Sequence, residues 1–137
     1  VTFVPAFVSK AVEAADDSAA TDSTFRRRHT RPGATLSEVA DMVDHVKRVA
    51  GVDHVGIGSD FDGISEVVVG LEDVSTFPAL FVELANRGWT QAELQKLAGG
   101  NVLRALRQAE AVSTRLKRER PASNATIEQL DRAVVRP

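Results

Sequence analysis

The sequence of 137 residues has no cysteine and only three histidines. Without cysteine there is no disulfide framework, no cysteine-based zinc site and no thiol nucleophile, so any metal must be bound by His, Asp or Glu. No apolar run approaches the roughly 20 residues that a membrane-spanning helix needs. The 17 basic and 19 acidic residues nearly balance, which argues against nucleic acid as the main partner. A hydrophobic content of 43% favours one ordinary globular domain.

The composition of the chain changes from apolar to polar at residue 10. Residues 1–8 are apolar at nearly every position and predict a strand covered on both faces, although Pro5 interrupts the pattern. Because the sequence opens on Val1 within this run, we expect that an N-terminal part is missing, in which case a signal peptide would not be visible. Residues 10–34 are polar and then basic, with four arginines between positions 26 and 31. They predict an exposed insertion with a helical turn near residues 12–15.

A βαβ unit is predicted over residues 1–60. Thr35 and Glu38 form a capping box, in which the hydroxyl and the carboxylate satisfy free amide groups at the start of a helix. Apolar residues then recur on one stripe as far as residue 50, and Gly51 ends the helix. Residues 54–60 are β-branched and glycine-rich and predict a second strand. We expect the two strands to be parallel neighbours.

A loop over residues 61–74 and three short helices are predicted next. We expect Ser75 to cap the first helix, a second capping box at residues 90–93 to begin the next, and Asn101 to cap the third. The residues predicted to face the core are Phe77, Leu80, Phe81, Leu84, Val102, Leu103 and Leu106. From residue 113 onward the composition predicts a polar tail, with a last amphipathic helix at residues 126–135.

Asp60 lies at the predicted end of the second strand. In parallel α/β proteins the catalytic groups gather at the carboxyl ends of the strands, and the neighbouring glycines leave room for a ligand, a water or a metal. An equally good interpretation is that Asp60 or Asp62 caps a turn. The run is not a calcium loop, because Ile64 and Ser65 stand where that loop needs an oxygen ligand and a glycine.

Four stretches of the chain combine into a specific pattern: FVPAFVS at residues 3–9, HVGIGSDFDG at 54–63, GLEDVS at 70–75 and GGNVLR at 99–104. In this order and spacing they resemble the carboxyl-terminal third of the membrane dipeptidase (renal dipeptidase) family of zinc peptidases. The first stretch is similar to the seventh barrel strand of that family. The resemblance covers roughly residues 1–112.

The resemblance implies an α/β fold, namely the last two βα units of a (β/α)8 TIM-type barrel of the metal-dependent hydrolases. Residues 1–112 would be the C-terminal part of the barrel and residues 113–137 a polar tail. The family cleaves dipeptides with two zinc ions, and Asp60 corresponds to its acid/base carboxylate. The residues implied to contact substrate are Phe7, where relatives often carry Tyr, together with Gly58, Ser59, Phe61 and Gly63.

No zinc ligand can be assigned in this sequence. The ligands of the family precede the matched region, and we expect His29, His45 and His54 to be structural or exposed, since none has a second ligand at a suitable spacing. The chain alone is therefore expected to be inactive.

The expected partners are a dipeptide substrate and the remainder of the barrel, with a second copy in a homodimer as a further candidate. Neither nucleic acid nor a membrane span is expected, and the predicted location is cytoplasmic unless a signal peptide precedes Val1. Two alternatives stay open. One is a non-catalytic binding module or pseudoenzyme that uses the basic residues 26–31. The other, a stand-alone α/β domain, is disfavoured because a two-stranded parallel sheet leaves unpaired edges.

Overall fold

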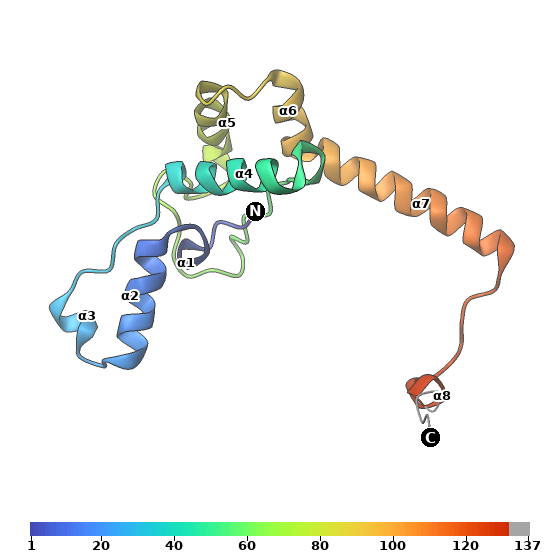
Figure 1. The fold of residues 1–137 in the computed structure, drawn as a ribbon, viewed down its shortest axis with the longest axis horizontal. Coiled ribbons are helices and arrows are strands. Elements are labelled where there is room, and N and C mark those ends of the chain that lie inside the picture. Colours follow the sequence, from blue (N-terminus) through green and yellow to red (C-terminus); the bar gives the residue numbers. More distant parts are fainter. Residues whose placement is uncertain (132–137) are drawn as a thin grey trace. The chain divides into compact units, whose positions relative to one another are not determined.

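The structure is a computed structural model that describes residues 1–131, and it divides the chain into two units, Val1–Leu103 and Arg104–Pro137. The first unit is mainly helical (Figure 1). Its elements are α1 (Pro5–Val8), α2 (Lys10–Thr21), α3 (Phe25–Arg28), α4 (Leu36–Ala50), the 3₁₀ turns η1 (Val52–His54) and η2 (Val74–Thr76), α5 (Phe77–Asn86), α6 (Gln91–Gln95) and the π-helical turn η3 (Lys96–Gly100). Helix α7 (Asn101–Glu119) begins in this unit, and α8 (Ile127–Asp131) belongs to the second.

Helix α4 has the boundaries that the sequence predicts. The Thr35 hydroxyl accepts a hydrogen bond from the Glu38 amide (3.4 Å), and the Glu38 carboxylate accepts one from the Thr35 amide (2.8 Å). Gly51 ends the helix with a φ of 91°, a conformation that glycine adopts at little cost. The predicted capping box and stop are confirmed.

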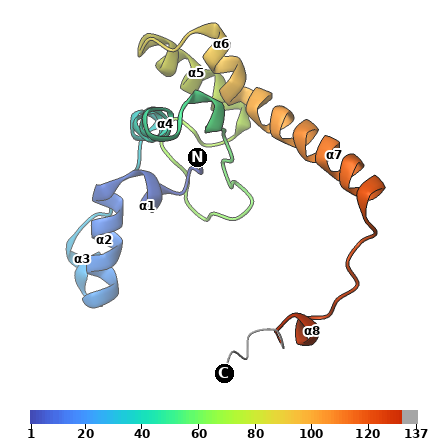
Figure 2. The same cartoon turned by 45° about the vertical axis from the view of Figure 1, so that its right-hand side comes forward.

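The core of the first unit lies around α4, which contacts α5 and α1 (Figures 1 and 2). In both views α5 and α6 lie together near α4. The buried apolar residues are Phe3, Val12, Ala34, Val39, Ala40, Val43, Val55, Val68, Leu71, Leu80, Leu84, Trp89 and Leu97. Leu80 and Leu84 are among the predicted core residues of α5, and both are fully buried.

A polar cluster joins the C-terminal end of α5 to α4. The Arg87 guanidinium donates to Asp41 (2.6 Å), Asp44 (3.1 Å) and Glu83 (2.8 Å), and the Trp89 indole donates to Asp44 (2.7 Å). Burial by itself lowers the pKa of Arg87, but the hydrogen bonds to these carboxylates outweigh it and raise the pKa above its ordinary value. The cluster therefore fixes the α5–α6 turn against α4 through charge-assisted hydrogen bonds.

Lys47 and Glu93 form a second link between α4 and the start of α6. The two side chains are 2.7 Å apart, and the Lys47 ammonium lies 4.2 Å from the centre of the Trp89 ring. The hydrogen bond from Lys47 lowers the pKa of Glu93 from 4.5 to about 2.

Replacing Glu93 with Gln is expected to lower the free energy of unfolding above about pH 4.5 and to have little effect toward pH 2. Gln keeps the side-chain acceptor of the capping box but loses the charge that faces Lys47. Because the pKa of Glu93 is depressed on folding, its stabilisation is fully present above about pH 4.5 and is lost as the pH falls through about 2. The urea midpoint of the wild type should exceed that of E93Q at pH 7, and the gap should close toward pH 2. A gap of equal size at every pH would contradict this account.

The predicted strands are only partly present. Residues 1–3 are extended, but Pro5–Val8 is a helical turn, because proline is well suited to the first position of a helix. Residues 55–59 are extended as well, and within residues 1–131 the only assigned β pairs are the isolated bridges Thr35–Val69 and Val68–Leu71.

The predicted insertion is a helix over much of its length. Ser9 begins α2 by accepting a hydrogen bond from the Val12 amide (3.4 Å), and Val12 is fully buried. The alanines of Lys10–Thr21 are the strongest helix formers, and they outweigh the Asp and Ser residues on which the loop prediction rested. The prediction of an exposed loop with one helical turn was therefore wrong for this segment.

Two predicted caps and one predicted core face were also wrong. Asp73, not Ser75, caps the turn before α5, because its carboxylate accepts a hydrogen bond from the Ser75 amide (2.7 Å). Asn101 does not act as a cap but directs its amide inward, as described below. The apolar side chains at the start of α7 lie outward instead, with exposed fractions of 60%, 50% and 54% for Val102, Leu103 and Leu106.

The second unit contains the rest of α7 and α8. Helix α7 continues through residue 113 to Glu119, since Arg, Gln, Lys and Glu are good helix formers. Helix α8 falls within the helix predicted at residues 126–135, and residues 132–135 of that prediction lie outside the described residues. None of the helices in the described part of the chain is long and apolar enough to cross a membrane.

Candidate active site

The candidate site lies where two extended segments run in parallel. The Val1 nitrogen donates to the Gly56 carbonyl (2.6 Å), the Gly58 amide to the Val1 carbonyl (3.0 Å), and the Phe3 amide to the Ser59 carbonyl (3.1 Å). These bonds give the parallel order predicted for the two strands. Asp60 directly follows the second segment, at the same edge at which the first segment enters α1.

The backbone of Asp60 adopts a conformation that is rare for residues with a side chain. Its φ is 68°, and it is the only residue other than glycine with a positive φ among those the structure describes. Asp and Asn tolerate this left-handed region better than most residues do. The side chain is exposed. Such local strain persists when the surrounding structure enforces it, and it is common at functional sites.

Ser59 and Phe61, the residues on either side of Asp60, are held in place by contacts with other parts of the chain. Ser59 is held by the hydrogen bond from the Phe3 amide, and the ring of Phe61 packs against Phe3 (5.9 Å between ring centres) and Phe77 (6.0 Å). Phe3 and Phe77 in turn meet edge to face at 5.7 Å. Aromatic pairs at these separations stabilise a fixed arrangement. The cluster of three phenylalanines thus holds the turn while the carboxylate of Asp60 points to solvent.

Gly63 provides the space that the Asp60 carboxylate occupies. The Gly63 amide donates to the Asp60 carbonyl (2.9 Å), which closes the turn. A Cβ atom at position 63 would lie 2.6 Å from Asp60 Oδ1, closer than real Cβ contacts. A side chain at this position would therefore force the carboxylate to move.

Replacing Gly63 with Ala is expected to displace the Asp60 carboxylate with little loss of stability, because the end of one short side chain can rotate away. If Asp60 acts in catalysis, kcat of a longer protein that includes the upstream coding sequence should fall by about 100-fold, since small misplacements of a catalytic group are costly. Gly56→Ala is the matched control, because its Cβ would meet only Val102 at an ordinary 3.8 Å. Equal activity of G63A and G56A would mean that the position of this carboxylate does not matter.

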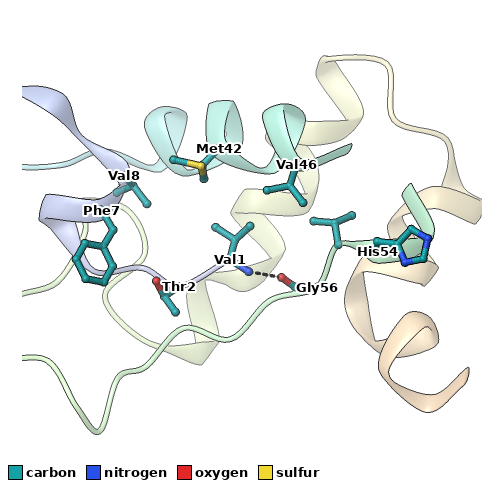
Figure 3. Close-up of a pocket in the computed structure, with 9 residues that line it drawn as sticks. Val1, Thr2, Phe7, Val8, Met42, Val46, His54 and Gly56 are labelled. Carbon is teal, nitrogen blue, oxygen red and sulfur yellow. Dashed lines mark hydrogen bonds between the residues drawn. The ribbon is translucent and has the colours of Figure 1, made fainter. Parts of the chain in front are cut away.

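Phe7 lies on α1 beside an apolar cavity of about 250 Å³ (Figure 3). The ring is 70% exposed, and the cavity is also lined by Val1, Val8, Met42 and Val46. Figure 3 shows Met42 and Val46 of α4 on one side of the cavity, with Val1 and Gly56 joined by their hydrogen bond below them. Asp60 does not line this cavity.

The structure therefore brings some of the predicted site residues together but not all. Ser59, Asp60, Phe61 and Gly63 share one turn, and the exposed Gly58 precedes it, with no atom beyond its chain neighbours within 4 Å of its Cβ position. Phe7 lies on α1, which follows the segment of residues 1–3. It lines the apolar cavity, to which no residue of the Asp60 turn contributes.

The residues described here do not gather metal ligands. No group of three or more His, Cys, Asp or Glu side chains lies close enough to hold an ion within residues 1–131. His29 stacks on Phe25 with ring centres 4.4 Å apart, and His45 lies 3.0 Å from the Arg48 guanidinium. This stretch of chain therefore does not fit two zinc ions by itself.

Asn101 has a role that the sequence analysis missed. Its side chain is buried, and its Nδ2 atom donates to the carbonyls of Val52 (2.7 Å) and Val55 (2.8 Å). The first residue of α7 thereby holds the start of the segment that leads to Asp60. An Asn that follows two glycines is typical of a helix cap, so the sequence predicted a local role for Asn101. Its bonds to Val52 and Val55, which lie far away in the sequence, could not be predicted from this pattern.

The sequence of the chain matches a known protein family. The model described as membrane dipeptidase (peptidase family M19) matches residues 1–120. The chain therefore belongs to the membrane dipeptidase family, which confirms the resemblance found in its sequence.

Among its relatives are Dipeptidase 3 of Macaca fascicularis and of Homo sapiens, which are 46% and 44% identical to it over 88 residues. In both cases the match covers 64% of this chain and 18% of the relative. Dipeptidase verJ of Clonostachys rogersoniana is 46% identical over 95 residues, which cover 69% of this chain and 24% of that protein. The chain thus spans about a fifth to a quarter of the length of the relatives that it matches.

Proposed function

We propose that this chain is the C-terminal part of a zinc-dependent dipeptidase that hydrolyses the peptide bond of dipeptides. The observation that carries the proposal is the exposed Asp60 carboxylate, which is held in a left-handed conformation between two fixed neighbours at the carboxyl end of a parallel pair. Membership of the membrane dipeptidase family supports the reaction class.

In this proposal Asp60 transfers a proton. Hydrolysis of a peptide bond removes a proton from the attacking water and delivers one to the leaving amine. A carboxylate within reach of both can accept the first proton and supply the second. Gly58, Ser59, Phe61 and Gly63 would form the rim around the reacting bond, and Phe7 would lie toward a substrate side chain.

The proposal places the zinc ligands and the rest of the barrel in parts of the protein that this chain does not include. Residues 1–112 would contribute the last two βα units of the barrel, and residues 113–137 a polar tail. The partners proposed are a dipeptide, the remainder of the barrel and, in a homodimer, a second copy.

Hydrolysis of a panel of small dipeptides tests the proposal. The panel is assayed with this chain alone and with a longer protein that includes the upstream coding sequence. We expect zinc-dependent hydrolysis only with the longer protein, abolished by a chelator and restored by added zinc. Absence of activity from a folded, zinc-loaded longer protein would favour a non-catalytic binding module instead.

A further inference from the structure

A cavity of about 390 Å³ lies next to the hairpin formed by α2 and α3, and we call it the basic cavity. It is lined by residues 26–31 and by Glu66. Helix α3 lies beside α2 in both overall views (Figures 1 and 2). Four of the lining side chains are arginines, although the chain as a whole carries a net charge of -2. The basic cavity is therefore a local concentration of positive charge.

Arg31 forms a fixed wall of the basic cavity. Its Nε and Nη2 atoms donate to the two carboxylate oxygens of Asp16 (2.7 Å each), and its Nη1 atom donates to Glu66. The hydrogen bond to Asp16 is the main cause that raises the pKa of Arg31 above its ordinary value. This guanidinium is permanently charged and is held on three sides by its partners.

The other arginines are not neutralised in the same way. Arg26 lies 3.8 Å from Asp16, a carboxylate that Arg31 already occupies. Arg27 and Arg28 are exposed and have no acidic partner among residues 1–131. Only Arg26 and Arg31 contact the two carboxylates of Asp16 and Glu66, so the charges of Arg27 and Arg28 are not compensated, and an anion in the cavity would relieve the mutual repulsion of the arginines.

The backbone that carries these arginines is held in place. The ring of His29 stacks on Phe25 with ring centres 4.4 Å apart and planes inclined by 19°, and its Nδ1 atom lies 3.3 Å from the Phe25 carbonyl. The His29 amide also donates to that carbonyl (3.0 Å). The two residues therefore fix both ends of the short helix that presents Arg27 and Arg28, which reduces the entropic cost of binding a ligand.

From these observations we infer that the basic cavity binds a doubly charged oxyanion of the phosphate type. Guanidinium groups match the oxygen geometry of phosphate with paired hydrogen bonds. The volume leaves room for an organic group attached to the phosphate. The inference is independent of the proposed hydrolysis, because no residue of the basic cavity belongs to the Asp60 turn.

Titration of the full chain with inorganic phosphate, at constant ionic strength maintained with chloride, tests the inference by calorimetry. We expect saturable binding to one site. The double variant Arg27→Gln and Arg28→Gln should bind at least about tenfold more weakly, which corresponds to a loss of about 1.4 kcal/mol. The matched control, Arg107→Gln and Arg118→Gln, removes the same charge from α7 and should bind as the wild type does. Circular dichroism of both variants verifies that they fold.

A second arm distinguishes a soluble ligand from a lipid headgroup. Flotation with phosphatidylcholine vesicles is compared with and without phosphatidic acid. Phosphate-sensitive binding to the phosphatidic acid vesicles would identify a headgroup as the source, and phosphate binding without flotation would identify a soluble phosphate compound. Either result supports the inference. An equal loss of phosphate binding in both double variants, or no saturable binding in either arm, would overturn it.

Discussion

Replacing Asp60 with Asn is expected to lower kcat of the proposed dipeptidase, assayed as the longer protein that includes the upstream coding sequence, by about 10²–10⁴-fold, the usual contribution of general acid-base catalysis. Asn has the same shape as Asp and tolerates the positive φ at this position, so the turn should keep its conformation. The amide cannot accept and return a proton. The measurement is kcat and KM for a good dipeptide substrate, together with zinc content, which should stay near that of the wild type.

Asp62→Asn is the matched control for this experiment, because Asp62 is an exposed carboxylate two residues further along the same loop. Its activity should be close to that of the wild type. Asp60→Ala should in addition lower stability by about 1 kcal/mol relative to D60N, since alanine is disfavoured in the left-handed region. Near-normal turnover of D60N would remove Asp60 from the proton-transfer role and leave it as a turn residue.

Replacing Asn101 with Asp is expected to lower the free energy of unfolding by about 4 kcal/mol, the cost of leaving two buried hydrogen-bonding groups unsatisfied. The substitution keeps the shape of the side chain but places a carboxylate against the carbonyls of Val52 and Val55, which then lack their donor. Urea unfolding of the full chain measures the effect.

Asn124→Asp is the control for N101D, because it makes the same chemical change at an exposed position of the second unit. Its urea midpoint should stay within error of the wild type. Equal midpoints for the two variants would show that the bonds from Asn101 contribute little to stability. Loss of stability confined to N101D would identify the first residue of α7 as a main support of the segment that ends at Asp60.

Apart from the parallel order of residues 1–3 and 56–59, the features that the sequence predicted correctly depend on neighbours along the chain. The two capping boxes and the glycine stop of α4 each involve residues within one helical turn of each other, and all three are present. The direction of the side chains at the start of α7 depends instead on distant elements, and there the prediction failed. Apolar Val102 lies outward and polar Asn101 inward, because two free carbonyls some 46–49 residues earlier in the chain need a donor.

At the candidate site, too, local features were predicted from the sequence and long-range features were not. The sequence of residues 58–63 predicted a carboxylate at the end of an extended segment, and the structure has an exposed Asp60 in a turn at this place. Composition could not reveal the positive φ of Asp60 or the lack of space at Gly63. Nor could it reveal that Phe3 and Phe77, which lie far from Asp60 in sequence, hold Phe61 in place.

The pairing of residues 1–3 with residues 56–59 has a consequence for the order of folding. Val1 and Gly56 are 55 residues apart, so their bond forms only after a long stretch of chain has closed into a loop. Contacts within α4, and between α5 and α6, join residues much closer in sequence and form sooner. The pairing that holds the segment before Asp60 is therefore completed late, after the local contacts of the helices have formed.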